Sequence, residues 1–447
     1  MTPLFKTLSH IVDSIPATAR LHSAISEDNA FVLSNLPASL DTLVFAHLFL
    51  TAKKYILLVF DEAKGAERAF DDLAKLLGED ALVLFSQVAQ QSTVKQELRK
   101  KTAMAENDAQ ILEALEKLTQ SKENLIVISD AESLLIGLPD PQIFSKETLH
   151  LSVGENIGYD FFSLWLREHR FEGKQFVETS GDYAIRGGII DIFPFTETIP
   201  FRIEFFGDAI ESIREFDAIS QRSIAQRQEL SLVPNALESE YISRTANLFN
   251  YLRHDTIICQ FEPEFIQNKL DTTDRGDMIN LLKEKTRFLV TNFPPEYSSA
   301  IDFRAKRQPS FNANLKVIRE QIHQLVEGGN TVIILSETKE LMKRMEDLLG
   351  SDELEKDFQT NEYADTILPT EPPNSFQKGK IIYKNPSLAH GFLLPETTKT
   401  VVFTEHELFG RRREHGAASR KRASRTKGIS LRELHILKRG KVLASVQ

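Results

Sequence analysis

The run Tyr55–Phe60 reads YILLVF, an uninterrupted apolar segment that follows one helix-like stretch and precedes another. Similar runs occur at Phe31–Leu33, Ala81–Phe85 and Leu125–Ile128. Short apolar runs that alternate with helical patterns are typical of a parallel sheet with helical crossovers. The sequence therefore predicts that the first domain is α/β.

Beyond about residue 150 the pattern changes to closely spaced strands. Phe201–Phe205 alternates apolar and charged residues, Gly207–Asp208 favours a tight turn, and Ile210–Phe216 reads as the returning strand. Arg202 and Glu204 then share the strand face opposite the apolar residues. This pattern predicts a small α+β insertion.

The later part of the chain returns to α/β patterning. We interpret residues 225–310 as a return to the first domain, and the strand and helix patterns from Asn314 as the start of a third domain that closes near Gly410. The segment Arg411–Lys427 has eight Arg or Lys residues and no apolar period. It is typical of an exposed linker.

Composition limits the possible classes of protein. A formal net charge of −10 argues against a general nucleic-acid binder, which needs a concentrated basic surface. The residues that might contact DNA phosphates, or simply solvate a linker, are Arg411, Arg412, Arg413, Arg420, Lys421 and Arg422.

The single cysteine, Cys259, lies in an apolar run, where a small buried side chain is expected. No secretory signal is recognisable, and Leu33–Ala52 carries Asp41 and His47, which favours a buried helix over a membrane span. We therefore expect a cytoplasmic protein without membrane contact.

The motifs of several enzyme classes are missing. No G-x-x-x-x-G-K-[ST] string occurs, because the residues after Gly173–Lys174, Gly379–Lys380 and Gly440–Lys441 are Gln, Ile and Val. Asp61–Glu62 follows an apolar run as a magnesium-binding pair would, but we interpret these carboxylates as caps of the next helix. Zinc-protease and serine-hydrolase motifs are also missing. We expect no catalytic residues, no metal and no cofactor.

Four strings carry a resemblance to a known family. They are Gly181–Pro194 (GDYAIRGGIIDIFP), Phe201–Asp208 (FRIEFFGD), Ile213–Asp217 (IREFD) and Ser220–Ser223 (SQRS). Together they resemble a block shared by UvrB and the transcription-repair coupling factors (Mfd), and the SQR ending is closer to the coupling factors.

Two further segments agree with that resemblance. Ser34–Leu40 (SNLPASL) is similar to the degenerate phosphate loop of the coupling factors, and Val401–Gly410 (VVFTEHELFG) resembles the family's junction before its RNA polymerase-interacting domain.

The resemblance implies that the excision-repair protein UvrA is the partner. The matching surface positions are Arg186, Asp191, Phe193, Arg202 and Glu204. An upstream arginine of the family falls near Phe171–Glu172, where this sequence offers Glu172 or the displaced Lys174.

The resemblance also implies a domain plan. Residues 1–130 and 225–312 are expected to form a nucleotide-dead, helicase-like (UvrB-like) parallel-sheet domain, with the UvrB-homology domain inserted at 131–224. A further α/β domain follows at 313–410. Residues 411–447 are expected to be the basic linker and a truncated start of the polymerase-interacting domain, so RNA polymerase binding and the ATP-driven motor are expected to be absent.

The function implied is recruitment of UvrA in transcription-coupled nucleotide excision repair. The alternative is a nucleotide-dependent DNA-handling protein similar to UvrB or to one half of a helicase.

Overall fold

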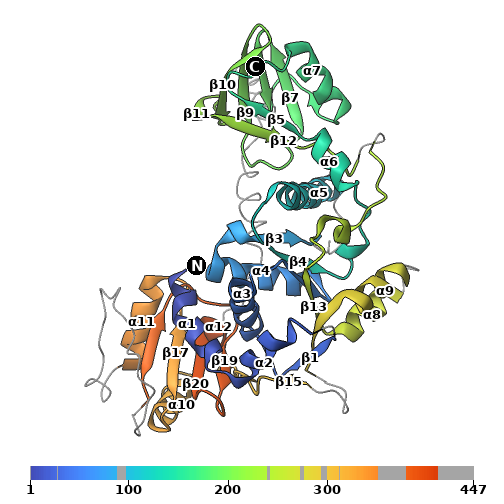
Figure 1. Ribbon diagram of the computed structural model, residues 1–447. Coiled ribbons are helices and arrows are strands. Elements are labelled where there is room, and N and C mark those ends of the chain that lie inside the picture. Colours follow the sequence, from blue (N-terminus) through green and yellow to red (C-terminus); the bar gives the residue numbers. More distant parts are fainter. Residues whose placement is uncertain are drawn as a thin grey trace. The chain divides into compact units, whose positions relative to one another are not determined.

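The computed structural model (Figure 1) describes residues 2–27, 29–87, 97–238, 242–271, 276–292, 300–311, 313–350 and 379–410. The basic segment Arg411–Lys427 lies outside the described residues. The chain divides into two compact units. Within the described residues, the first unit consists of 2–82, 124–131 and 255–410, and the second of 83–123 and 132–254.

A parallel sheet forms the centre of the first unit, where strands β15, β1, β14, β13, β2 and β4 lie in this order. Strand β2 has all five of its residues buried, as expected for an apolar run covered on both faces. Its bounds and those of its neighbours are β1 (Phe31–Ser34), β2 (Ile56–Phe60), β4 (Ile126–Asp130), β13 (Ile257–Phe261), β14 (Thr286–Val290) and β15 (Ile301–Asp302). The α/β prediction for the first domain is confirmed.

Helices flank this sheet. Helix α3 packs against α1 and α4, while α8 and α9 pack against β13. Glu62 occupies the N-cap position of α4 but makes no capping hydrogen bond through its side chain. The predicted helix start after Asp61–Glu62 is confirmed, and the expected carboxylate cap is wrong. The helices are α1 (Pro3–Asp13), α2 (Pro16–Ala24), α3 (Leu40–Ala52), α4 (Ala63–Leu77), α8 (Pro263–Asp271) and α9 (Gly276–Lys285).

A second, smaller sheet completes the first unit, with the order β16-β19-β20-β17-β18. The β17–β18 and β17–β20 pairs are parallel, and the pairs that involve β19 are antiparallel. The elements are β16 (Lys306–Arg307), α10 (Leu315–Glu327), β17 (Thr331–Leu335), α11 (Lys339–Gly350), β18 (Ile381–Lys384), β19 (Phe392–Leu394), β20 (Thr400–Thr404) and α12 (Glu405–Phe409).

A largely antiparallel sheet dominates the second unit, with the order β11-β10-β9-β8-β7-β6. The apolar residues of its inner face pack against helix α7, for example Ile190 and Ile203 in one cluster with Phe162 and Trp165. The predicted hairpin is confirmed as β9 paired with β10. The elements are β6 (Glu172–Gly173), β7 (Asp182–Arg186), β8 (Ile189–Ile192), β9 (Phe201–Phe206), β10 (Ala209–Phe216), β11 (Ser223–Arg227) and α7 (Tyr159–Glu168).

Strand pairing in the second unit continues past residue 224, the expected end of the insertion. β11 pairs with β10, and β12 pairs with β5. The remaining elements of the chain are η1 (Glu79–Ala81), β3 (Leu82–Phe85), α5 (Glu97–Gln120), η2 (Ser133–Leu135), α6 (Pro141–Glu147), β5 (Leu149–Ser152), β12 (Glu229–Leu232) and η3 (Leu248–Tyr251).

Candidate functional site

The predicted interaction residues gather on the outer face of the β7–β11 sheet, opposite the face that packs on α7. Strand register places Asp191 beside Arg202 and Arg202 beside Arg214 in one row. A neighbouring row runs from Arg186 through Ile189 to Glu204. Alternation along each strand sends these side chains away from the inner core.

Asp191 and Arg202 form the centre of this face. The carboxylate accepts two hydrogen bonds from the guanidinium, at 2.7 Å from Nε and 2.9 Å from Nη2. Its side chain is 2% exposed and that of Arg202 18% exposed. The hydrogen bonds to Asp191 raise the pKa of Arg202. This ion pair therefore forms a rigid support beneath the surface, and little of its own area is accessible to a partner.

Among Arg186, Asp191 and Arg202, the most exposed residue is Arg186, with 40% of its side chain accessible. Its guanidinium lies 3.6 Å from Asp191 and 5.0 Å from the centre of the Phe176 ring, and it donates to the carbonyl of Gln175 at 2.8 Å. Stacking on an aromatic ring and a nearby carboxylate both orient the guanidinium. A guanidinium carries five N–H donors, more than these contacts use.

Glu204 belongs to a second ion pair on the same face. It accepts a hydrogen bond from Ser212 at 2.8 Å and pairs with Arg214. Phe193 is half-buried and packs against Val177 and Phe216. The five predicted residues therefore lie on one domain, and the sheet brings Arg186, Asp191 and Arg202 into direct contact.

Two further parts of this domain bear on the resemblance: the SQRS string and the residues just upstream of Gly181. Asp217 accepts a hydrogen bond from the Ser220 amide at 2.7 Å, which lowers the pKa of Asp217 and fixes the turn of the SQRS string. Upstream of the block, Glu172 and Lys174 form an exposed ion pair with each other. Phe176 and Arg214 were not among the predicted residues, because the sequence does not show which side chains they contact.

The segment that resembles a degenerate phosphate loop connects β1 to α3 in the first unit. Asn35 and Ala38 adopt left-handed backbone angles, with φ of 50° and 56°. Such angles are ordinary for glycine and uncommon for alanine. In the eight-residue phosphate-loop spacing, Asn35 and Leu40 stand at the glycine positions, and Asp41 and Thr42 at the Lys and Ser/Thr positions.

Asp41 reverses the charge that a phosphate site requires. It is nearly buried and pairs with both terminal nitrogens of Arg68, at 2.8 and 2.5 Å. The amides of Leu40 and Asp41 donate to the carbonyls of Pro37 and Ala38. These two amides and the first turn of α3 are thus engaged within the protein instead of pointing at an anion.

A segment of the smaller sheet's domain also packs on this loop. The amide of His390 donates to the Ser39 hydroxyl at 2.9 Å, and that of Ala389 donates to Asp72 at 2.7 Å. Lys75 donates to the carbonyl of Ser387 at 2.8 Å. Burial raises the pKa of Asp72, and Arg68, 3.7 Å away, opposes that shift.

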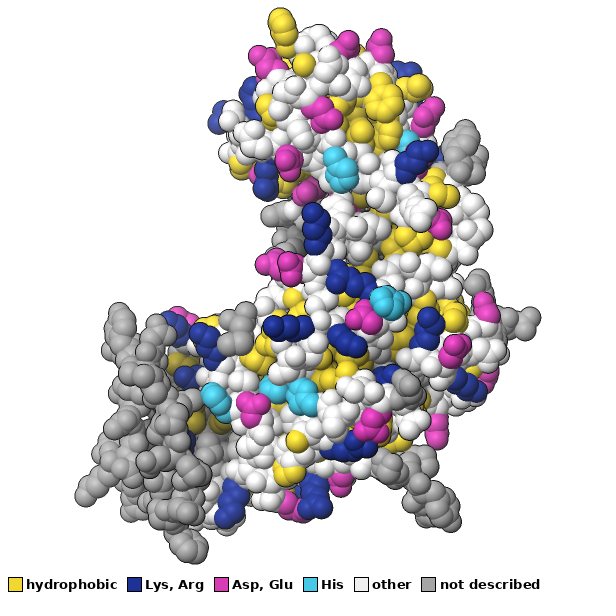
Figure 2. Space-filling view, viewed as in Figure 1, with side chains coloured by type: hydrophobic (Ala, Val, Ile, Leu, Met, Phe, Trp, Pro, Cys, Tyr) yellow, Lys and Arg dark blue, Asp and Glu magenta, His cyan; other side chains and the backbone are white. Residues whose placement is uncertain are grey.

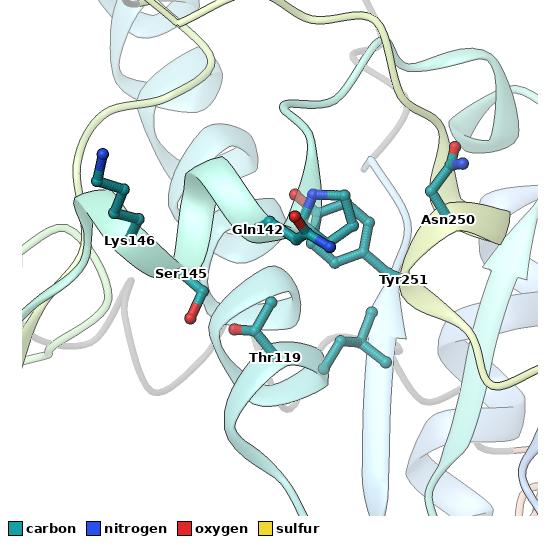
Figure 3. A pocket seen from close by; sticks show the side chains of 8 residues that line it. Thr119, Gln142, Ser145, Lys146, Asn250 and Tyr251 are labelled. Atoms are coloured by element: carbon teal, nitrogen blue, oxygen red, sulfur yellow. The ribbon is translucent and has the colours of Figure 1, made fainter.

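An open hollow in the second unit is lined by both apolar and polar side chains, including Leu118 and Pro141 (Figure 3). Thr119, Gln142, Ser145 and Asn250 line it together with Lys146 and Tyr251. The Tyr251 hydroxyl donates to the carbonyl of Pro139, and burial raises its pKa. No pair of nucleophile and base lies among these lining residues.

The face drawn in Figure 2 carries basic and acidic side chains intermixed. Among the described helices, none combines the length and apolar character that crossing a bilayer requires.

Comparisons with known proteins identify the domain that carries this surface. Residues 149–237 match the UvrB interaction domain, the range that includes all five predicted residues. The chain is 22% identical to the transcription-repair-coupling factor of Bacillus subtilis (strain 168), over 88% of this chain and 39% of that protein.

It is 23% identical to the transcription-repair-coupling factor of Staphylococcus aureus (strain bovine RF122 / ET3-1), over 96% of this chain and 41% of that protein. The chain spans about two-fifths of the length of these relatives. The predicted resemblance is confirmed: this chain is similar along most of its length to transcription-repair-coupling factors, and its residues 149–237 match the UvrB interaction domain.

Proposed function

We propose that this chain recruits UvrA in transcription-coupled nucleotide excision repair, as the N-terminal region of a transcription-repair coupling factor, and that it hydrolyses no nucleotide itself. The observation that carries the proposal is the outer face of the β7–β11 sheet. It lies within the match to the UvrB interaction domain, and it holds an accessible arginine beside an aromatic ring.

Arg186 is the proposed anchor of the interface. Arginine and aromatic residues are enriched among the residues that dominate binding energy. Arg186 is pre-oriented by Phe176 and Asp191, so binding would fix little additional side-chain freedom. Asp191 is proposed to position Arg186, and Arg202 to hold Asp191 in place, while Glu204 and Phe193 lie elsewhere on the same domain.

The residues of the loop before α3 are the reason for proposing that this chain hydrolyses no nucleotide. A triphosphate needs backbone amides, a lysine and a metal-binding hydroxyl. Here an aspartate stands at the lysine position, and its carboxylate is held by Arg68. An incoming phosphate would find no lysine there, and the carboxylate in its place is already paired with Arg68.

Binding of purified UvrA to wild-type chain, Arg186→Ala and Arg167→Ala tests the docking proposal. Arg167 is the matched control, because it is exposed on α7, the helix that covers the other face of the sheet. We expect micromolar or tighter binding, at least tenfold weaker with Arg186→Ala, about 1.4 kcal/mol, and unchanged with Arg167→Ala. Absence of binding by folded wild-type chain would refute the proposal.

A further inference from the structure

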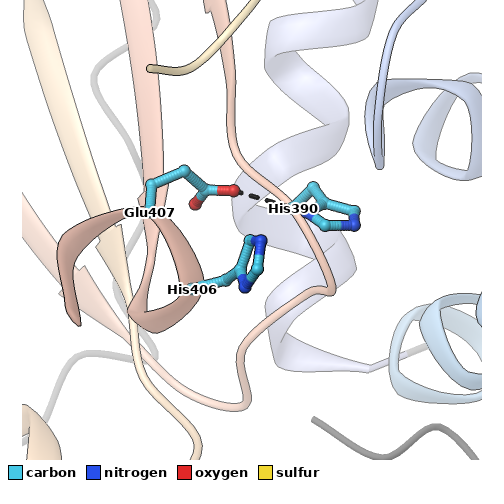
Figure 4. Close-up of side chains that lie close together, drawn as sticks. All are labelled: His390, His406 and Glu407. Carbon is cyan, nitrogen blue, oxygen red and sulfur yellow. Dashed lines mark ion pairs between the residues drawn. The ribbon is translucent and has the colours of Figure 1, made fainter. Parts of the chain in front are cut away.

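Two histidines and one glutamate converge in the first unit, away from the surface assigned to UvrA. His390 lies on the segment before β19, while His406 and Glu407 lie in α12, and Figure 4 shows the three side chains close together. One potential ligand atom from each lies within 4.8 Å of the other two. The imidazole rings of His390 and His406 meet edge to face, with centroids 4.8 Å apart.

The glutamate of this cluster is held in place before any ion arrives. Its Oε2 accepts hydrogen bonds from the amide and the hydroxyl of Thr404, at 3.0 and 2.5 Å. Its Oε1 accepts one from the amide of Gly391 at 3.1 Å and lies 3.5 Å from Nδ1 of His390. Outer hydrogen bonds of this kind orient a carboxylate ligand, and the Oε1 atom retains a second lone pair.

One separation within the cluster already matches that of a small tetrahedral ion. With metal–ligand bonds of about 2.1 Å, two ligand atoms of a tetrahedral zinc site lie about 3.4 Å apart. The pair His390 Nδ1 and Glu407 Oε1 is already at 3.5 Å. The other separations reach up to 4.8 Å, so binding would require His406 or His390 to move closer to the ion.

We propose that His390, His406 and Glu407 bind one divalent transition-metal ion of the zinc type, with solvent at the fourth position. Two imidazoles with one carboxylate suit zinc or cobalt better than magnesium or calcium, which prefer all-oxygen sites. The side chain of His390 is 37% exposed, so an ion reaches the cluster without unfolding the protein. This assignment is independent of UvrA docking, since no residue of the β7–β11 sheet takes part.

The site also has a structural consequence. The amide of His390 donates to Ser39, and Ala389 donates to Asp72, so this segment already packs on the loop before α3. A metal ion that joins His390 to α12 would cross-link that segment to its own domain. Any ligand that binds only the folded state stabilises it in proportion to its affinity and concentration.

The test is titration of the full chain, free of any histidine tag, with Zn²⁺ by calorimetry and with Co²⁺ by visible absorption. Wild type is compared with His390→Gln, His406→Gln and the double variant. His323→Gln is the matched control, because His323 is also a half-exposed histidine paired with a glutamate, Glu327 at 3.3 Å, on α10.

We expect one equivalent of metal, a Co²⁺ spectrum of tetrahedral type, and a rise in the unfolding temperature on adding Zn²⁺. Each single variant should bind at least tenfold more weakly, and the control should bind as wild type does. Circular dichroism of each variant confirms that it is folded. No stoichiometric binding by wild type, or binding retained within twofold by the double variant, would overturn the assignment.

Discussion

Asp41 and Arg68 form a two-pronged ion pair inside the first unit, with Oδ1 2.8 Å from Nη1 and Oδ2 2.5 Å from Nη2. The side chains are 7% and 14% exposed. The pair connects the first turn of α3 to α4, and Arg68 also reaches the carbonyl of Ala38 at 3.3 Å. A charged residue in a mostly apolar helix is thereby neutralised, and the loop before it is fixed.

Loss of one partner should be costly because the other charge stays buried. We predict that Asp41→Ala lowers the free energy of unfolding by about 3 kcal/mol. Arg20→Ala is the control, since Arg20 and Glu27 are 49% and 40% exposed, and an exposed ion pair contributes little to stability. Urea unfolding followed by circular dichroism measures both. Equal effects of the two variants would contradict the account of this pair.

Alanine substitutions of Arg202 and Arg186 should differ in their effect on the free energy of unfolding. We predict that Arg202→Ala destabilises the second unit by about 2–3 kcal/mol, because it removes both hydrogen bonds from the buried Asp191. Arg186→Ala should cost less than about 1 kcal/mol, since Arg186 is more exposed and lies 3.6 Å from Asp191.

The only tryptophan of the chain, Trp165, lies in the core of this unit and reports its unfolding. If this fluorescence signal showed Arg186→Ala to be as destabilising as Arg202→Ala, the loss of UvrA binding by Arg186→Ala could reflect unfolding. It would then not show that Arg186 contacts UvrA.

Nucleotide binding should be absent or very weak. With Asp41 at the lysine position and the amides of Leu40 and Asp41 bonded to backbone carbonyls, we predict that ATP with Mg²⁺ binds with a Kd weaker than about 1 mM. Calorimetry measures this directly. Micromolar binding would favour the alternative of a nucleotide-dependent DNA-handling protein.

The single cysteine should resist modification in the folded protein. Cys259 is fully enclosed in β13, and burial raises the pKa of its thiol well above the ordinary value. Because the thiolate is the reactive form, we predict that a thiol reagent at pH 8 labels Cys259 only after urea unfolds the first unit. Rapid labelling under native conditions would show that β13 is accessible.

The sequence predicted the α/β first domain and the β9–β10 hairpin well, because apolar runs and period-two alternation record burial directly. It predicted that Arg202 and Glu204 share a face. It did not predict that Arg202 is largely buried against Asp191, because pairing between strands depends on register that no local pattern contains.

Other features were beyond local reasoning for the same reason. Asp41 was recognised as an unusual charge in an apolar stretch, but its partner Arg68 lies on another helix. The cap expected at Glu62 failed because a carboxylate before a helix need not turn toward its amides. His390 and His406 are separated by β19 and β20, so only the folded sheet brings them together.

Hydrogen–deuterium exchange of the chain, with and without UvrA, tests the docking surface most directly. The account predicts that UvrA slows exchange in residues 174–192 and 201–206, around Arg186, and leaves α7 unchanged. Exchange that is unaffected by saturating UvrA, or slowed only in α7 or the first unit, would contradict it.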